Sequence, residues 1–262
     1  QLITCILHLF RRRILFHRLI CDTDTTGKVK TQPKYNPDAL QAKGFGPPMI
    51  MLNVTSIMRQ HDKENTDFYN KNIDMFLSDM DLCIHPECKC CFESVAPDGS
   101  RLTGPRGRFV NPGHSIEGAW FMMNEAEYRS DDALMEKALQ LLDWSFRLGW
   151  DDKDGGIQYF ADIEGKPISQ LEWDMRLWWP HCEALIAFIK AYRITGKPEY
   201  LEKFQMVHDY TFSHFKDEEY GEWYGYLRRD GSVNNELKGS LFKGPFHIPR
   251  ALMEVAAELG KL

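Results

Sequence analysis

The stretch Asn-Pro-Gly-His-Ser-Ile-Glu at residues 111–117 decides the fold that we expect, because it is a turn leading into a helix and it recurs. Trp-Trp-Pro-His-Cys-Glu at 178–183 and Gly-Pro-Phe-His-Ile-Pro-Arg at 244–250 have the same character. Each places a histidine one or two residues after proline and ahead of an apolar helical run. The three histidines, His114, His181 and His247, are spaced by 67 and 66 residues. The chain is therefore built from repeats.

A second signal repeats with the histidines. An acidic residue followed by glycine stands between extended, aromatic-rich runs at Asp98-Gly99, Glu164-Gly165 and Asp230-Gly231. Such a pair predicts a hairpin, because the turn needs positive φ and glycine supplies it without strain. The three glycines are 66 residues apart in both intervals. A period of this size indicates a repeated unit of helix, hairpin and helix.

The apolar spacing predicts the helices of these units. We expect helices at 49–59, 62–82, 114–127, 132–149, 181–195, 198–215 and 247–259, with Asp132 as a cap. Repeated helix pairs are typical of an α-solenoid or a closed α/α barrel. Six such pairs need roughly 400 residues, and this chain of 262 residues holds about four. We therefore expect an all-α, (α/α)6 barrel-like toroid that lacks its first helix pairs and carries short hairpins at one end, and we expect that it is open or is completed by another chain.

Composition limits the location and the class of partner. We expect residues 1–46 to be an atypical N-terminal segment and linker, followed by a partial barrel domain at 47–262. The three arginines at Arg11–Arg13 interrupt the first apolar run, so this run fits neither a signal peptide nor a membrane span. A net charge of −6 argues against nucleic acid and against anionic membranes as partners. Seven irregularly placed cysteines indicate a reducing compartment, so we expect a cytoplasmic protein.

One cysteine-rich stretch carries enough soft ligands for zinc. Residues 83–91 hold four cysteines and His85, but their spacing fits no two-pair zinc pattern and Pro86 lies inside. A reduced cluster at a hairpin edge is the alternative that we favour, and we predict no metal site.

Six stretches together carry a resemblance to a known family. Residues 111–117, 155–160, 170–173, 177–184, 219–227 and 243–250 resemble, in order, the N-acylglucosamine 2-epimerase family, also known as renin-binding protein. The resemblance runs from about Pro47 to the C-terminus. It implies an (α/α)6 barrel that interconverts N-acetyl-D-glucosamine and N-acetyl-D-mannosamine as a homodimer. It also implies ATP or another nucleotide as an activator, with no cofactor required for the chemistry, and leaves renin as a possible partner. The family's first two helix pairs, with a substrate-contacting arginine, have no counterpart here.

Epimerisation next to a carbonyl removes a proton from one face of the carbon and returns one to the other. Histidine suits both roles because its unperturbed pKa lies near 6.5. Histidines two repeats apart in a ring face each other, so His114 and His247 are the expected pair, in agreement with matching positions in the family. Glu183 matches a residue that the family needs, and we expect it to position the substrate or a histidine.

Further residues have two readings each. Glu117 orients an imidazole or binds a sugar hydroxyl, or it stabilises the helix N-terminus. His181 contacts substrate or packs in the core. Trp120 and Trp179 offer aromatic faces to a pyranose or fill space between helices. Arg250 steadies an enediolate oxygen or forms a helix ion pair.

Three other functions remain open at this stage. An aldose–ketose isomerase or a disaccharide 2-epimerase would use the same barrel and histidines. A glycoside hydrolase would need a pair of acidic residues flanking the bond, whereas histidine is the group that recurs here. A truncated, non-catalytic interaction protein of the renin-binding type is the third.

Overall fold

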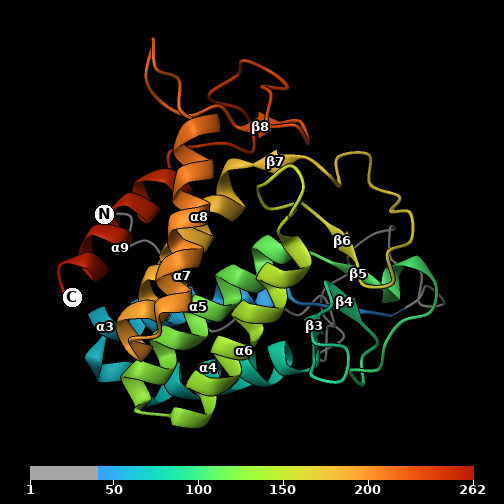
Figure 1. Ribbon diagram of the computed structural model, residues 1–262. Coiled ribbons are helices and arrows are strands. Elements are labelled where there is room, and N and C mark those ends of the chain that lie inside the picture. The colour runs from blue at the N-terminus through green and yellow to red at the C-terminus, as the bar shows by residue number, and fades with distance from the viewer. Residues whose placement is uncertain (1–40) are drawn as a thin grey trace.

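The computed structural model describes residues 41–262, so the predictions for residues 1–40 lie outside the described part (Figure 1). Seven α-helices within 41–262 form successive hairpin pairs and one further helix. They are α3 (Gly46–His61) with α4 (Thr66–Asp81), α5 (Pro112–Arg129) with α6 (Asp132–Gly149), α7 (Trp178–Thr195) with α8 (Pro198–His214), and α9 (His247–Leu259).

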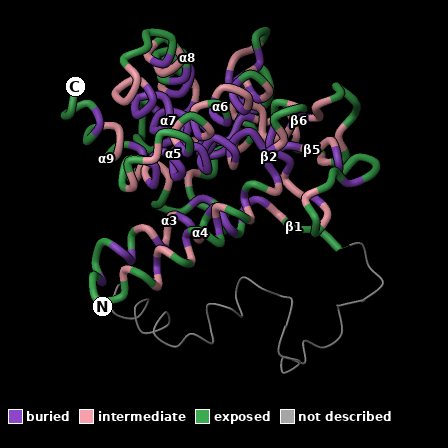
Figure 2. Tube along the Cα trace, turned by 90° about the horizontal axis from the view of Figure 1, so that it is seen from below, coloured by how far each residue is buried: buried purple, intermediate pink, exposed green. Residues whose placement is uncertain are grey.

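The helices make two layers. α3, α5, α7 and α9 pack side by side, and α4, α6 and α8 each pack against the preceding helix from outside. α5 and α7 are consequently buried along most of their length, and Figure 2 shows this buried interior between more exposed edges. The prediction of an all-α arrangement of repeated helix pairs is confirmed.

Local chemistry sets where these helices begin and end. The Asn111 side chain accepts a hydrogen bond from the His114 N–H at 3.1 Å and so caps α5. Asp131 does the same for α6 through the Leu134 N–H, so the cap lies one residue before the predicted Asp132. α7 starts three residues earlier than predicted, because Pro180 is tolerated in a first helical turn.

Regular structure begins before residue 46, where the predicted N-terminal linker ends. β1 (Lys43–Gly44) pairs with β4 (Ser94–Val95), and α3 begins at Gly46. Phe45 between them is fully buried, and its N–H donates to the Glu93 carbonyl at 3.1 Å. Burial of an aromatic side chain together with a paired backbone fixes this approach to α3.

The predicted acidic-glycine turns are present. Gly99, Gly165 and Gly231 all have positive φ, at 84°, 66° and 82°, and each donates its N–H to the carbonyl three residues earlier. Their flanking strands, however, pair mainly with neighbouring segments of the chain. β5 (Phe109–Val110) pairs with β6 (Ala161–Asp162), and β7 (Arg176–Leu177) pairs with β8 (Tyr226–Leu227). These short ladders lie along the side of the helices where α5 and α7 begin, and they tie one repeat to the next (Figure 1).

The cysteine-rich stretch is a small hairpin of β2 (Ile84–His85) and β3 (Cys90–Cys91). Cys83, Cys90 and Cys91 are buried free thiols. Burial raises the pKa of Cys83 and of Cys90 to about 12. These cysteines pack as small apolar side chains.

The remaining regular elements are two 3-10 turns, η1 (Lys63–Asn65) and η2 (Pro105–Gly107). Within residues 41–262 no helix combines the length and the apolar character needed to cross a bilayer.

Candidate active site

A cavity of about 600 Å³ opens among the inner helices. His114 and Glu117 of α5, Trp179 of α7, and His247 and Arg250 of α9 line it. Its walls are completed by Met49, Asn53, Tyr159, Glu172, Tyr226 and Phe246, among others. Polar groups therefore converge from three inner helices on a space lined mostly by apolar side chains, as in many small-molecule sites.

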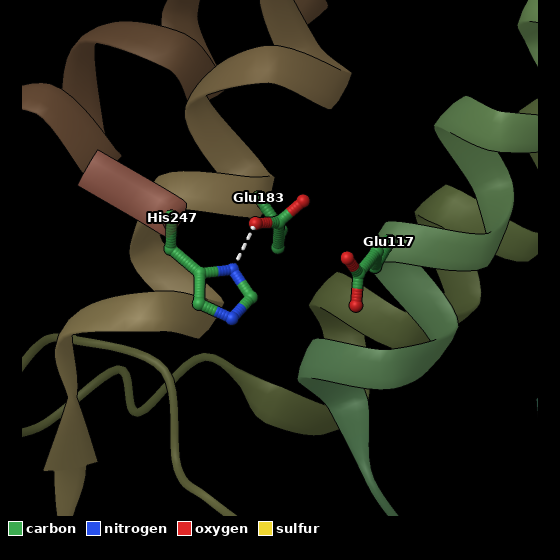
Figure 3. Close-up of side chains that lie close together, drawn as sticks. All are labelled: Glu117, Glu183 and His247. Carbon is green, nitrogen blue, oxygen red and sulfur yellow. Dashed lines mark hydrogen bonds and ion pairs between the residues drawn. The ribbon is translucent and has the colours of Figure 1, made fainter. Parts of the chain in front are cut away.

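His247 is held by a buried carboxylate. Its Nδ1 lies 2.7 Å from Oε1 of Glu183, which comes from the second turn of α7 (Figure 3). The other Glu183 oxygen accepts a hydrogen bond from the Trp120 indole at 2.9 Å. Burial opposes the charge on Glu183, but the bond to His247 and the charge of Arg250 outweigh it and lower the pKa of this carboxyl. An ionised Glu183 orients the imidazole and leaves its Nε2 available to a ligand.

Arg250 bridges two carboxylates. Its Nη2 lies 2.5 Å from Glu117 and 2.6 Å from Glu183. Burial, with the nearby charge of Glu183, raises the pKa of Glu117 to about 7, although Arg250 opposes the shift. Ligand atoms of Glu117, Glu183 and His247 lie within 4.8 Å of one another, close enough for a cation (Figure 3). The guanidinium already supplies positive charge between these two carboxylates.

His114 has a carboxylate partner of its own. Its Nδ1 lies 3.1 Å from both oxygens of Glu93, on the segment between β3 and β4. Burial disfavours a charged imidazole, but the hydrogen bond and charge of Glu93, with smaller effects of Glu117 and Glu183, raise the pKa of His114. Sequence reasoning missed Glu93, because it lies in no motif and meets His114 only through tertiary packing.

Trp179 lies against both histidines. Its ring centroid is 5.1 Å from that of His114 and 5.7 Å from that of His247. The N-terminal turn of α5 approaches this indole closely at Gly113, where a Cβ would come within 2.6 Å of the ring. One indole therefore packs against both imidazoles, and it lies in the wall of the cavity.

The structure corrects two predicted substrate contacts. His181 is fully buried, and both of its ring nitrogens bond to the backbone, Nδ1 to the Leu177 carbonyl at 2.7 Å and Nε2 to the Ile157 N–H at 3.0 Å. His181 therefore packs in the core and does not line the cavity with His114 and His247. Trp120 is only 2 % exposed, and its indole N–H donates to Glu183, so it positions that carboxylate and does not line the cavity.

The remaining predicted residues come together as expected in space. His114, Glu117, Trp179, His247 and Arg250 line one cavity, with Glu183 bonded to two of them. Neighbouring repeats thus deliver their functional side chains from the same end of each inner helix.

Paired helices around a cavity with two carboxylate-held imidazoles define the class of fold, an α/α-barrel protein. A solved structure described as D-mannose isomerase superposes with a TM-score of 0.70 at 19% identity, covering 82% of this chain and 56% of that one. Residues 24–248 match the family model for N-acylglucosamine 2-epimerase, and the chain belongs to that family.

Curated relatives agree with this assignment. N-acylglucosamine 2-epimerase of Rattus norvegicus is 41% identical over 216 residues, which is 82% of this chain and 52% of the relative. The protein of the same description from Homo sapiens is 38% identical over 222 residues, 84% of this chain and 52% of the relative. The chain therefore spans about half the length of the curated relatives that it matches.

Proposed function

We propose that this site interconverts N-acetyl-D-glucosamine and N-acetyl-D-mannosamine by moving the proton at C2 between two faces. The observation that carries the proposal is the pair of histidines, each with a carboxylate on Nδ1, beside one indole at one cavity. Membership of the epimerase family supports the choice of an amino sugar.

The proposed reaction uses both histidines. In the open-chain sugar, Nε2 of one histidine removes the C2 proton, and the electron pair moves onto the C1 carbonyl to give a planar enolate that carries the acetamido group at C2. The Nε2 proton of the other histidine is then delivered to the opposite face of C2, and the carbonyl re-forms. Each well-placed acid or base contributes roughly 10²- to 10⁴-fold to the rate. Arg250 at the same wall of the cavity is suited to steady the enolate oxygen at C1.

Further features of the whole protein are proposed from the family alone. We propose a homodimer in the cytoplasm that needs no cofactor for the chemistry and is activated by ATP or another nucleotide. Renin is a candidate partner because of the family's second name.

The test is C2 exchange in deuterated water. Purified chain is incubated with N-acetylmannosamine, mannose or cellobiose, and the products are analysed by NMR. Deuterated N-acetylglucosamine from the first sugar supports the proposal, with His114→Asn/His247→Asn as the inactive control. Turnover of mannose or cellobiose alone would indicate a related isomerase or disaccharide epimerase, and no exchange with any sugar by folded chain would contradict catalysis.

A further inference from the structure

The two imidazoles of the site are held by unequal carboxylates. Glu183 is completely buried and shares its charge with Arg250 as well as with His247. Glu93 is 24 % exposed, and within residues 41–262 no lysine or arginine forms an ion pair with it. The negative charge of Glu93 is therefore directed at His114 alone among the basic groups of the described chain.

We propose that Glu93 is the positioning residue of this site: it keeps a proton on Nδ1 of His114 and favours the imidazolium, so that Nε2 faces the cavity as the acid of the pair. The inference rests on the proposed function, because it assigns the resting roles of the two histidines. His247 is then the base that takes the first proton, and His114 the acid that delivers one.

The backbone around Glu93 is built to hold this contact. The Glu93 N–H donates to the Phe109 carbonyl at 3.2 Å, and its own carbonyl accepts from the Phe45 N–H at 3.1 Å. Phe109 belongs to β5, two residues before the Asn111 cap of α5. The carboxylate and the imidazole are thus fixed to connected pieces of backbone, so the 3.1 Å contact does not depend on a freely moving loop.

The other charges near His114 agree with this assignment. Glu117 faces it from its own helix and Glu183 from α7, and both add negative charge. Glu172 lines the same cavity. The positive groups are Arg250, which is bonded to Glu117 and Glu183, and His247, which is bonded to Glu183. Glu93 therefore decides the charge of His114, since an opposite charge in contact favours the charged form.

The first measurement needs no catalysis. In the full chain labelled with ¹⁵N-histidine, long-range ¹H–¹⁵N spectra give the tautomer and the titration midpoint of His114, assigned with His114→Asn. Glu93→Gln should lower the midpoint by about one pH unit or more, and Glu93→Asp should restore part of it. The control is Glu87→Gln, which removes another His–Glu contact, from His85 Nδ1 at 2.7 Å, on the neighbouring hairpin. An unchanged His114 midpoint in folded Glu93→Gln would overturn the inference.

The second measurement asks whether the contact serves the reaction. Glu93→Gln should lower kcat at least about tenfold with little change in KM, and it should slow deuterium delivery to one face of C2 more than to the other. Glu93→Asp should recover part of the rate. Equal rates for wild type and Glu93→Gln would overturn the positioning role. If the wild-type chain exchanges no sugar, the proposed function fails, and the NMR titration still decides whether Glu93 controls His114. Circular dichroism of each variant separates misfolding from a local effect.

Discussion

His181 is an imidazole that its surroundings keep neutral. Burial, with the nearby charges of Arg176 and His214, lowers its pKa to about 3, although its bond to the Leu177 carbonyl opposes the shift. The unfolded chain binds a proton near pH 6.5 while the folded chain does not. Between these two values the unfolded state therefore holds more protons, and the stability of the fold decreases as pH falls.

His181→Asn should remove this dependence. The wild type should lose up to about 1.4 kcal/mol of unfolding free energy per pH unit below pH 6.5 more than the variant does. Urea unfolding at pH 7 and pH 5 measures the difference, with His208→Asn on the exposed surface of α8 as the control. The variant should also be less stable at pH 7, because the Ile157 N–H loses its acceptor. Parallel pH dependences in wild type and His181→Asn would contradict the assignment.

Replacing either cavity histidine should change the reaction rate and not the stability of the fold. In any preparation in which the chain epimerises, His114→Asn and His247→Asn should each lower the rate by roughly 10²- to 10⁴-fold without unfolding. Each variant should still exchange the C2 proton of one epimer with deuterium, and the two should differ in which one. NMR of both sugars in deuterated water measures this. Full activity of either variant would leave a single base serving both faces.

The residues of the site were partly predictable. His114 and His247 follow from the repeat, and Glu183 and Arg250 from the stretches that contain them. His181 shares the motif of the other two histidines, and nothing local reveals that α7 turns its ring towards the backbone at Ile157. Glu93 is found only when the chain is folded, because its partner lies 21 residues away.

At the scale of elements, a buried ion pair joins the first two inner helices. Arg59 of α3 donates to both oxygens of Glu125 of α5, at 2.9 and 2.6 Å, and both side chains are almost completely buried. Arg59→Met should cost about 3–5 kcal/mol, because Glu125 then keeps its charge in the core, and Arg129 is its one remaining ion-pair partner among residues 41–262. Thermal unfolding measures the loss.

Lys137→Met is the matched control, because its pair with Asp81 is largely exposed and should be worth at most about 1 kcal/mol. Arg59→Met/Glu125→Leu should recover much of the stability, since no buried charge is left alone. A loss in the double variant as large as in the single one would argue that packing, rather than charge, holds α3 to α5.

The contact between α5 and α7 can be probed at Gly113. An alanine Cβ there would meet Trp179 at 2.6 Å and Pro180 at 3.0 Å, so Gly113→Ala should cost about 1–3 kcal/mol. It should also lower kcat, because the displaced indole supports both imidazoles. Gly239→Ala is the control, since its nearest neighbour would be 4.0 Å away. Unchanged stability and rate in Gly113→Ala would show that Trp179 can shift without disturbing the fold or the two imidazoles.

Elements with local signals were predicted well. Caps, prolines and the glycine turns mark the helices to within a few residues, because they act on neighbouring backbone. The pairing of β5 with β6 and of β7 with β8 joins segments some 50 residues apart, and no local pattern specifies such partners.

At the scale of the whole molecule, one edge remains apolar. Only Ala251 and Glu258 of α9 are buried, whereas Leu252, Met253 and Leu259 are exposed by 52 %, 71 % and 49 %. Phe242 and Phe246, just before α9, are also exposed, but both line the cavity and are not counted in this edge. Clustered apolar side chains of this kind favour association.

We expect the isolated chain to self-associate through this edge. The sedimentation coefficient should increase with protein concentration, and Met253→Lys should weaken that increase by placing a charge on the contact. Met206→Lys on the exposed side of α8 is the control. A compact monomer over the whole concentration range, with full activity, would contradict both the association and the expected open barrel.

The turns between paired helices are suitable sites for attaching a tag. The α5–α6 and α7–α8 turns close at Ser130 and Gly196, at the ends of α5 and α7 opposite to the side chains that line the cavity. Lys197 is exposed, whereas Gly196 beside it has a φ of 67° and is best kept as glycine. An affinity tag attached at this turn would bind the molecule to a surface with its cavity facing the bulk solution.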